Sequence, residues 1–441
     1  MKLALISSFV IAASAQNLQS CVTDFNSETD YFTQKYNETN SEFTVTYSKH
    51  YKTLINKLSN QTFVLHQCGT PVPKNVPAGA AIYSIPLKKI AVGDTTVLTF
   101  LEALGVSSAI TLSSALDYTV SPCLQASNIT ALNATNLRVQ AEQYKTVDAY
   151  FTGYASDSNP NNTVLFPASN SKDSDYRTNW IDMIGEDTAK KVRSSIEDNF
   201  SCLLSGAKDA GTKEGKPVIA WTNYEAPSDF NQNKAAWVVS AAPYKLDYSQ
   251  DAGGNPLNLG EVRKSFATSK EFLEAIANVD IIIDESFASL NATNFHKTYS
   301  LESNTTTIKA FDSKNIYQEQ GLVNAIGGSA WFESAVLFKH LVLGYAQFQL
   351  VFIPSNNFNF RDLISILHPQ SMPGYKRTYF INIFSEKSKV VNESDCKAED
   401  KNQLSIPKIQ CPVKIESPKS SSRKGFVASG ALALFLVTLL L

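Results

Sequence analysis

The sequence lacks the cysteine spacing of a zinc or redox site. Its six cysteines include no C-x-x-C pair, which excludes the common zinc and thioredoxin-type motifs. It also lacks an excess of one charge, since 39 Lys and Arg stand against 41 Asp and Glu with no long block of either. Such a balance gives no basic face, so a nucleic-acid partner is excluded. The G-x-S-x-G spacing of a nucleophile elbow and internal repeats are absent as well.

The amino terminus has the pattern of a secretory signal peptide. Lys2 is followed by a mostly apolar run to Ala13, and Ala13-Ser14-Ala15 has the small-residue spacing of a cleavage site. We therefore expect residues 1–15 to be a signal peptide and the mature chain to begin near Gln16.

The carboxyl terminus has the pattern of a lipid-anchor signal. Ser417–Ser422 is small and polar, and Phe426–Leu441 is almost entirely apolar up to the last residue. A small attachment residue, a polar spacer and an apolar tail indicate a GPI signal. We expect attachment at Ser420, a signal over 420–441 and a location on the extracellular face of the plasma membrane. The alternative is a tail-anchored span, for which the apolar run is short.

Sequons and cysteines agree with the secretory route. Nine N-x-S/T sequons in a chain with a signal peptide predict solvent-facing glycosylated loops. Six cysteines in an oxidising compartment favour three disulfides. We expect Cys396 to pair with Cys411, because the two are close in sequence. The predicted glycosylation sites are Asn37, Asn60, Asn128, Asn133, Asn161, Asn199, Asn291, Asn304 and Asn392.

The first half of the chain contains a strand–helix–strand unit. Residues 89–92 read as a short buried strand, and Asp94 or Thr95 is placed to cap the helix that follows. That helix ends at Gly105, and residues 109–112 read as the next strand. Repeated units of this kind build a parallel sheet.

The second half repeats the pattern. Strands are predicted over 217–221, 236–239 and 280–283, helices over 331–348 and 361–367, and Thr268 opens a capping box. The fold class is therefore α/β, a bilobal clamshell of two parallel-sheet-based lobes joined by a long interlobe helix. The expected divisions are an N-terminal lobe over 16–185, the interlobe helix over 186–208, a C-terminal lobe over 209–385 and a stalk over 386–419.

Polar and aromatic residues follow the predicted strands of both lobes. In open α/β sheets ligands bind beyond the carboxyl ends of the strands, and aromatic surface with a few polar groups suits a small molecule. Adjacent residues on a strand point apart, so Asp284 and Glu285 are not expected to share a proton. One of the two is expected to cap a turn and the other to be solvated. Trp331 either lines the cleft or anchors its helix in the core. The ligand-binding candidates are Asp94, Thr95, Thr96, Asp117, Tyr118, Trp221, Tyr224, Tyr244, Asp284, Glu285, Ser286 and Trp331.

An ordered set of segments resembles the class III periplasmic binding proteins, the iron–siderophore and vitamin B12 binding subunits of bacterial importers. The resemblance covers roughly Phe63 to Phe384. Within this range the sequence looks most like eukaryotic surface proteins that carry this bacterial-type domain. The segments that carry it are Ile85–Val92, Phe100–Gly105, Asp251–Asn255, Val279–Asp284, Trp331–Glu333 and Asp362–Pro369.

The resemblance implies a rigid interlobe helix and a ligand held between the lobes. Members bind iron chelates, haem, cobalamin or bare metal. This sequence departs from the metal-binding branch, because only His66 and His296 fall near strand ends or loops, whereas His368 is expected to be structural. No metal site and no cofactor are therefore expected.

The expected function is non-enzymatic capture of a small ligand, an iron–siderophore or similar metal chelate, for delivery to a surface transporter or reductase. Two alternatives stay open. The first is a GPI-anchored surface hydrolase that uses Asp284 or Glu285. The second is a cell-surface structural or adhesion protein that kept the fold without the ligand, which side chains filling the interlobe space would favour.

Overall fold

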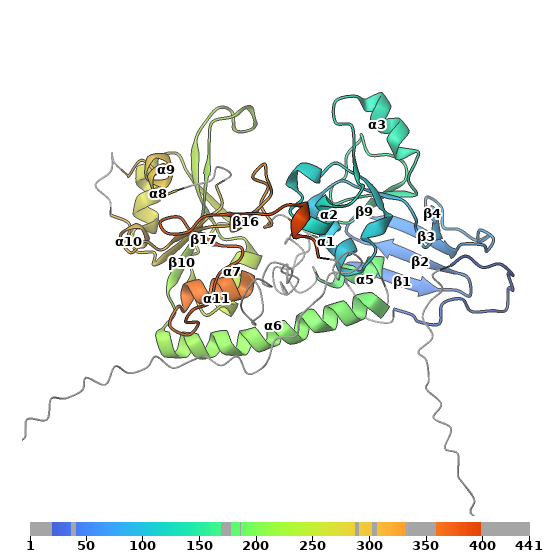
Figure 1. The fold of residues 1–441 in the computed structure, drawn as a ribbon, viewed down its shortest axis with the longest axis horizontal. Helices are drawn as coiled ribbons and strands as arrows, with labels where there is room; N and C mark the ends of the chain where they lie inside the picture. Colours follow the sequence, from blue (N-terminus) through green and yellow to red (C-terminus); the bar gives the residue numbers. More distant parts are fainter. Residues whose placement is uncertain are drawn as a thin grey trace, which may run out of the picture.

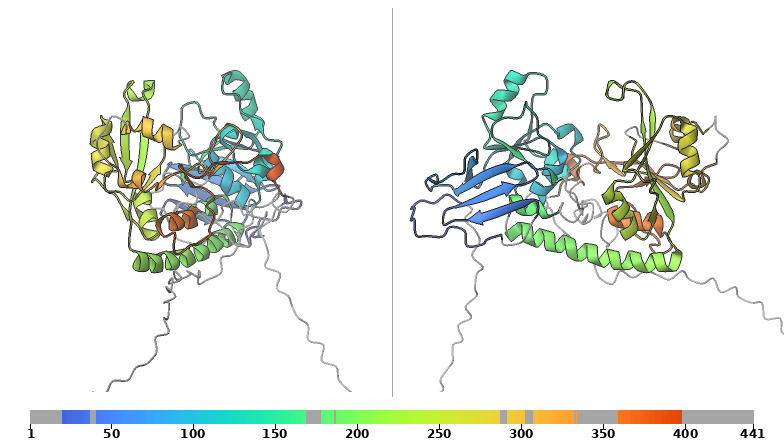
Figure 2. Two further views of the ribbon diagram at one scale, coloured as in Figure 1. Left: turned by 60° about the vertical axis from the view of Figure 1, so that its left-hand side comes forward. Right: turned by 180° about the vertical axis from the view of Figure 1, so that it is seen from behind.

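The computed structural model describes residues 20–36, 41–168, 178–185, 187–286, 291–301, 307–331, 333 and 359–397. In this part of the chain two α/β lobes stand on one long helix, α6 (Asp187–Glu214), as Figures 1 and 2 show. The predicted bilobal α/β fold is confirmed. The expected signal peptide, GPI signal with Ser420, helix after residue 333, Cys411, Asn37 and Asn304 lie outside the described residues.

Lobe one contains two sheets. The first is antiparallel except for its last pair, with the order β1 (Phe43–Tyr47), β2 (Tyr51–Asn56), β3 (Gln61–Gln67) and β4 (Ala81–Ile85). The second is parallel throughout, with the order β7 (Thr130–Ala131), β6 (Ile110–Ser113), β5 (Ile90–Val92), β8 (Ala149–Thr152) and β9 (Thr163–Leu165). Its helices and 3-10 turns are α1 (Thr95–Ala103), η1 (Ser107–Ala109), η2 (Leu116–Tyr118), α2 (Pro122–Gln125), α3 (Leu137–Tyr144) and α5 (Ile181–Ile184).

Lobe two is built on one mixed sheet. Its parallel centre is β10 (Val218–Glu225), β14 (Ile281–Asp284) and β15 (Ile316–Gln318), with β12 (Asn255–Pro256) also parallel to β10. Three strands run antiparallel to their neighbours, namely β11 (Ala236–Ser240), β13 (Arg263–Phe266) and β17 (Ile381–Asn382). The helices and 3-10 turn are η4 (Asp229–Asn231), α7 (Pro243–Asp251), α8 (Ser269–Ile276), α9 (Ala292–Thr298), α10 (Lys309–Asp312) and α11 (Asn359–Leu367).

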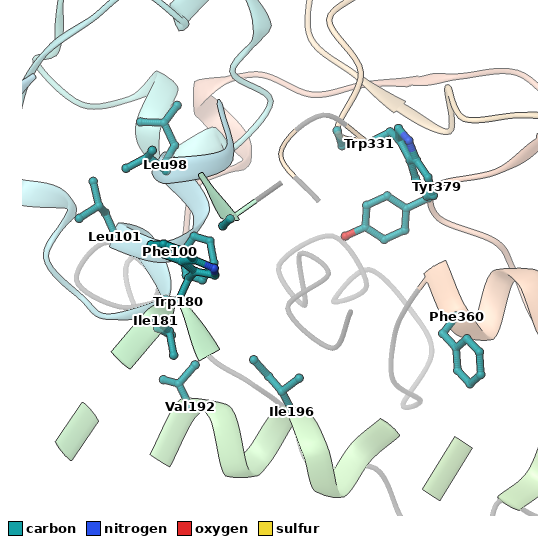
Figure 3. Close-up of a cluster of buried hydrophobic side chains, with 14 of the residues drawn as sticks. Leu98, Phe100, Leu101, Trp180, Ile181, Val192, Ile196, Trp331, Phe360 and Tyr379 are labelled. Carbon is teal, nitrogen blue, oxygen red and sulfur yellow. The ribbon is translucent and has the colours of Figure 1, made fainter. Parts of the chain in front are cut away.

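One hydrophobic cluster runs through both lobes and α6. Phe100 and Trp180 belong to lobe one, Val192 and Ile196 to α6, and Tyr379 to lobe two, as Figure 3 shows. The apolar residues of α6 recur at helical spacing, so one stripe of the helix packs against the core. Because one helix contributes to the core beneath both lobes, it fixes the distance between their sheets.

Two further segments pass from lobe two to lobe one. After β15 the chain forms β16 (Leu322–Val323), which pairs in parallel with β18 (Lys389–Val390). Beyond β18 lies the 3-10 turn η8 (Glu393–Asp395), and the next residue, Cys396, is disulfide-bonded to Cys123 in α2 of lobe one. Residues 389–397 are thus part of the folded body, although they fall within the predicted stalk over 386–419.

The disulfides differ from the expected pairing. Cys396 bonds to Cys123, and Cys21 bonds to Cys68, so the expected Cys396–Cys411 bridge is wrong. Proximity in sequence failed as a guide because the β16–β18 pairing carries Cys396 across to the other lobe. The partners are 273 residues apart in sequence.

The sequons mostly lie at the surface. Asn60, Asn128, Asn161, Asn291 and Asn392 are exposed and Asn133 is partly exposed. Asn199 corrects the expectation, because it is only 2% exposed and lies on the inward face of α6. A glycan at that position would have to displace the core, so we do not expect one there.

We predict that a non-reducing digest will contain a peptide pair linked through Cys123 and Cys396. The double variant Cys123→Ser/Cys396→Ser should lower the free energy of unfolding by about 2–4 kcal/mol, because the bond restricts the unfolded chain. The control is Cys21→Ser/Cys68→Ser, which leaves the two lobes linked. A peptide joining Cys396 to Cys411 would contradict the described pairing.

Candidate functional site

A buried ion pair lies at the carboxyl end of the lobe-two sheet. Glu285 follows β14 directly, and its carboxylate pairs with the Nζ of Lys245 on α7. The two side chains are 17% and 6% exposed. Lys245 Nζ also donates to the Oγ of Ser240 at 3.1 Å. Such enclosure makes the pair far less screened than a surface ion pair.

Aromatic rings surround this pair. Lys245 Nζ lies 5.5 Å from the ring centroid of Trp221 and 5.6 Å from that of Tyr244. Trp331 packs on Trp221 with ring centroids 6.1 Å apart. A cation at these distances is stabilised by the ring faces. The site therefore joins one cation, one anion and flat apolar surface.

Glu319 adds a second carboxyl group to the site. It follows β15, the strand beside β14, and its Oε1 has no hydrogen-bond partner within the described part of the chain. Burial raises the pKa of Glu319 well above its ordinary value of 4.5, and the charge of Glu285 raises it further. Burial therefore favours the protonated form of Glu319, which can donate a hydrogen bond. We call Lys245, Glu285 and Glu319 the Lys245 cluster.

Asp284 belongs to the other face of the sheet. Its carboxylate accepts hydrogen bonds from the Thr222 hydroxyl at 3.0 Å, the Ser286 amide at 3.0 Å and the Tyr299 hydroxyl. Burial raises the pKa of Asp284. Because Asp284 and Glu285 have separate partners, the two carboxylates do not form a catalytic pair. The turn-capping role expected for one of them is confirmed for Asp284, whereas Glu285 is ion-paired rather than solvated.

Tyr224 and Ser286 share the surroundings of Asp284. The Ser286 hydroxyl accepts from the Tyr224 amide at 2.9 Å and lies 3.3 Å from the Tyr299 hydroxyl. The Tyr224 ring packs against Trp237, with centroids 5.5 Å apart. These contacts fix the strand ends and separate both residues from the Lys245 cluster.

In lobe one, Asp94 closes the start of α1. Its carboxylate accepts from the Thr96 amide at 3.1 Å and from the Gly153 amide at 2.6 Å. The second bond ties α1 to the loop after β8, and burial raises the pKa of Asp94. Thr95 and Thr96 form the first helical turn and are partly exposed. Asp94 is thus a cap, and no described contact connects these three residues with the Lys245 cluster.

Asp117 and Tyr118 meet the segment that crosses from lobe two. The Asn324 amide donates to the carbonyl of Asp117 at 2.8 Å and to that of Thr119 at 3.2 Å. A Cβ at Gly328 would lie 2.9 Å from the Asn324 Nδ2 and 3.0 Å from the Asp117 carbonyl oxygen, so a larger residue there would push these neighbours apart. The Tyr118 side chain is 50% exposed. The backbone of Asp117 thus contacts the segment from lobe two, whereas the side chains of Asp117 and Tyr118 face solvent.

Glu333 makes several buried polar contacts with lobe one. Its Oε1 accepts from the Val120 amide at 2.6 Å and its Oε2 from the Ser121 amide at 3.1 Å. Its backbone carbonyl accepts from the Thr99 hydroxyl at 2.6 Å. A buried carboxylate that accepts several backbone N–H groups is well compensated. We call the contacts of Asn324 and Glu333, together with the Cys123–Cys396 bond, the interlobe tie.

Of the twelve candidates, three contact Lys245, namely Trp221, Tyr244 and Glu285, and a fourth, Trp331, packs on Trp221. Sequence reasoning missed Lys245, Glu319, Asn324 and Glu333. The position of Lys245 next to the candidate Tyr244 could have indicated it, and Glu333 lies in one of the segments that carry the resemblance. Nothing local marks Glu319 or Asn324, since their roles depend on strand pairing.

Neither a metal site nor a membrane span is found in the part of the chain that the structure describes. Among those residues, no three His, Cys, Asp or Glu side chains gather closely enough to hold a metal ion. Their helices are also too short or too polar to cross a bilayer.

Comparison with known proteins gives partial structural likenesses. No family model and no curated protein matches the chain. A periplasmic haem-binding protein from Pseudomonas aeruginosa is 8% identical, with a TM-score of 0.40 over 53% of this chain and 84% of that one. Helicobacter pylori CeuE with Ni(II) bound is 12% identical, with a TM-score of 0.44 over 69% and 92%.

A protein of an Fe3+-hydroxamate transport system from Saccharomonospora viridis is 13% identical, with a TM-score of 0.38 over 52% of this chain and 84% of that one. All three TM-scores lie below 0.5. The evidence for the bilobal architecture is therefore the strand order and the connecting helix of this chain itself.

We predict that Glu319→Gln will change how stability depends on pH. A carboxyl whose folded pKa is raised is most stabilising below its unfolded value, here 4.5, and loses that contribution as the pH rises through the folded pKa. Glutamine does not ionise, so the variant should gain stability relative to the wild type as the pH rises above 4.5. Denaturant unfolding at a series of pH values measures this. Parallel profiles for the two proteins would show that Glu319 is not buried in the folded state.

Proposed function

We propose that this chain is a non-enzymatic solute-binding protein that holds a small ligand at the Lys245 cluster, between its lobes. The observation that carries the proposal is the buried carboxyl of Glu319, which lacks a described hydrogen-bond partner at its Oε1 and lies at the carboxyl edge of a parallel sheet. That edge is where open α/β sheets bind ligands. A strongly shifted pKa beside a charge partner is also typical of functional sites.

The proposed ligand is rich in oxygen acceptors, with an iron–siderophore or similar metal chelate as the class. Lys245 donates, burial favours the donating, protonated form of Glu319, and Trp221 and Trp331 offer flat apolar surface near Lys245. A few donors within aromatic walls orient a ligand of this kind. The low exposure of Lys245 and Glu285 means that entry requires movement of the surrounding side chains.

The hydrolase alternative has lost its basis. It relied on Asp284 or Glu285 as a catalytic carboxylate, and the two lie on opposite sides of β14, where Asp284 is bound by Thr222 and Glu285 by Lys245. General acid–base catalysis needs both groups within reach of one substrate. Binding therefore accounts for the geometry better than hydrolysis does.

We predict that ferric siderophore, haem or cobalamin will quench tryptophan fluorescence in a titration, since Trp221 and Trp331 adjoin the site. Lys245→Met/Glu285→Met removes both charges together, so neither is left buried alone. Loss of a charge-assisted hydrogen bond should weaken binding at least about tenfold. The matched control is Lys264→Met/Glu261→Met, which removes an exposed pair. Unchanged fluorescence with all three ligands at micromolar concentration would sink the proposal.

A second candidate is a surface structural protein, and the interlobe tie favours it. The disulfide and the Glu333 and Asn324 contacts hold the lobes in one arrangement. Solution scattering separates the two functions. A solute-binding protein should change its scattering profile or its stability when a ligand is added, whereas a structural protein should respond to none.

We further propose that the chain works outside the cell, tethered through a GPI anchor at Ser420. The disulfides support this location, since they persist in oxidising compartments. Phosphatidylinositol-specific phospholipase C should release the protein from intact cells. A chain ending before Ser417 should still bind ligand yet fail to support uptake. Retention on cells after lipase treatment would argue against the anchor.

A further inference from the structure

The sheet of β1–β4 presents an apolar inner face within lobe one. Lys52, Leu65 and Tyr83 lie directly opposite one another on β2, β3 and β4, and Leu54 lies opposite Phe63 in the next row of this face. Directly opposed residues in neighbouring strands share one face of the sheet. Tyr83 is therefore part of a wall made mostly of aliphatic and aromatic side chains.

A cavity of about 450 Å3 lies against this wall. Its other sides come from α1, the parallel sheet and α5, through residues such as Leu101, Phe151 and Met183. The volume falls within the range of small-molecule sites. Lys52 is the one charged side chain among its lining residues.

The Tyr83 hydroxyl is the polar group that this cavity leaves unsatisfied. Tyr83 is only 7% exposed, lines the cavity, and its Oη has no hydrogen-bond partner in the part of the chain that the structure describes. Burial raises the pKa of Tyr83 to about 12, so the hydroxyl keeps its proton and remains a donor. Buried polar groups in native proteins nearly always find a partner.

We infer that this cavity binds an uncharged, largely apolar molecule whose single hydrogen-bond acceptor, such as a carbonyl oxygen, takes the Tyr83 hydroxyl. An ionised group there would be far more costly to bury than one hydrogen bond repays. The nearest cation does not change this, since Lys52 Nζ lies over the rings of Phe32 and Tyr47, 5.8 Å from each centroid.

This site is separate from the proposed interlobe site. It is lined by lobe one and by Thr188 at the start of α6, and its lining shares no residue with the Lys245 cluster. One ligand can therefore bind without the other, and the failure of either proposal leaves the other standing.

Calorimetric titration of the full chain tests the inference with a medium-chain methyl ketone. The comparison ligands are the isosteric alkene, in which a methylene replaces the carbonyl oxygen, and the fatty acid of equal length. The wild type should bind the ketone about fivefold more tightly than the alkene, the worth of one neutral hydrogen bond. In Tyr83→Phe the ketone should lose this preference, because its carbonyl would be buried without a hydrogen-bond donor.

Two variants complete the test. Ala109→Phe places a ring in the cavity and should abolish binding of both uncharged ligands, which keeps the test decisive if Tyr83→Phe folds poorly. Lys245→Met/Glu285→Met should bind the ketone as the wild type does. The inference is overturned if the wild type binds neither uncharged ligand, if Tyr83→Phe keeps the ketone preference, or if the fatty acid binds more tightly than the ketone.

Discussion

The carboxylate of Glu333 is the contact on which the arrangement of the two lobes depends most. It accepts two backbone N–H groups at the start of α2, and the hydroxyl of Ser121 there donates in turn to Glu102 of α1. Hydrogen bonds to a charged acceptor contribute about 1.5–3 kcal/mol each, and removing a buried partner costs more. Together with the Cys123–Cys396 bond, this contact holds lobe one against segments that originate in lobe two. The long helix α6 sets the spacing of the lobes, and the interlobe tie sets their orientation.

This constraint explains why polar residues near the strand ends divide into two groups. Asp94 and Asp284 belong to the first group, whose carboxylates fix the local backbone. Asp94 accepts hydrogen bonds from the Thr96 and Gly153 amides, and Asp284 from the Thr222 hydroxyl and the Ser286 amide. In the Lys245 cluster, by contrast, Glu285 pairs with Lys245, whose Nζ lies over the rings of Trp221 and Tyr244. A site whose walls are fixed by a covalent bond is pre-organised, so a ligand loses little freedom in the protein when it binds. The same rigidity restricts entry, which is why binding and a purely structural role need separate tests.

The sequence predicted the elements whose causes are local. The strand–helix–strand unit of residues 89–112 follows from a cap at Asp94 and apolar residues at helical spacing, and it is confirmed as β5, α1 and β6. The opposite faces of Asp284 and Glu285 also follow from strand alternation. The partners of Cys396 and Glu333 did not follow, because they are brought together by pairing between β16 and β18 and by the packing of the lobes. No pattern in the sequence marks Glu319 as a site residue, because only the pairing of β14 with β15 brings it near Glu285.

The hydroxyl of Tyr83 and one carboxyl oxygen of Glu319 both lack a described hydrogen-bond partner, in two different environments. Each is a buried polar atom without a described partner, and burial disfavours the charged form of each side chain. Their surroundings differ, since Glu319 lies beside an ion pair and Tyr83 faces apolar side chains. Partners suited to them must differ in the same way, an oxygen-rich polar ligand for Glu319 and an uncharged apolar one for Tyr83. If both atoms have ligands in solution, the fold carries two binding sites of opposite character, one between the lobes and one inside lobe one.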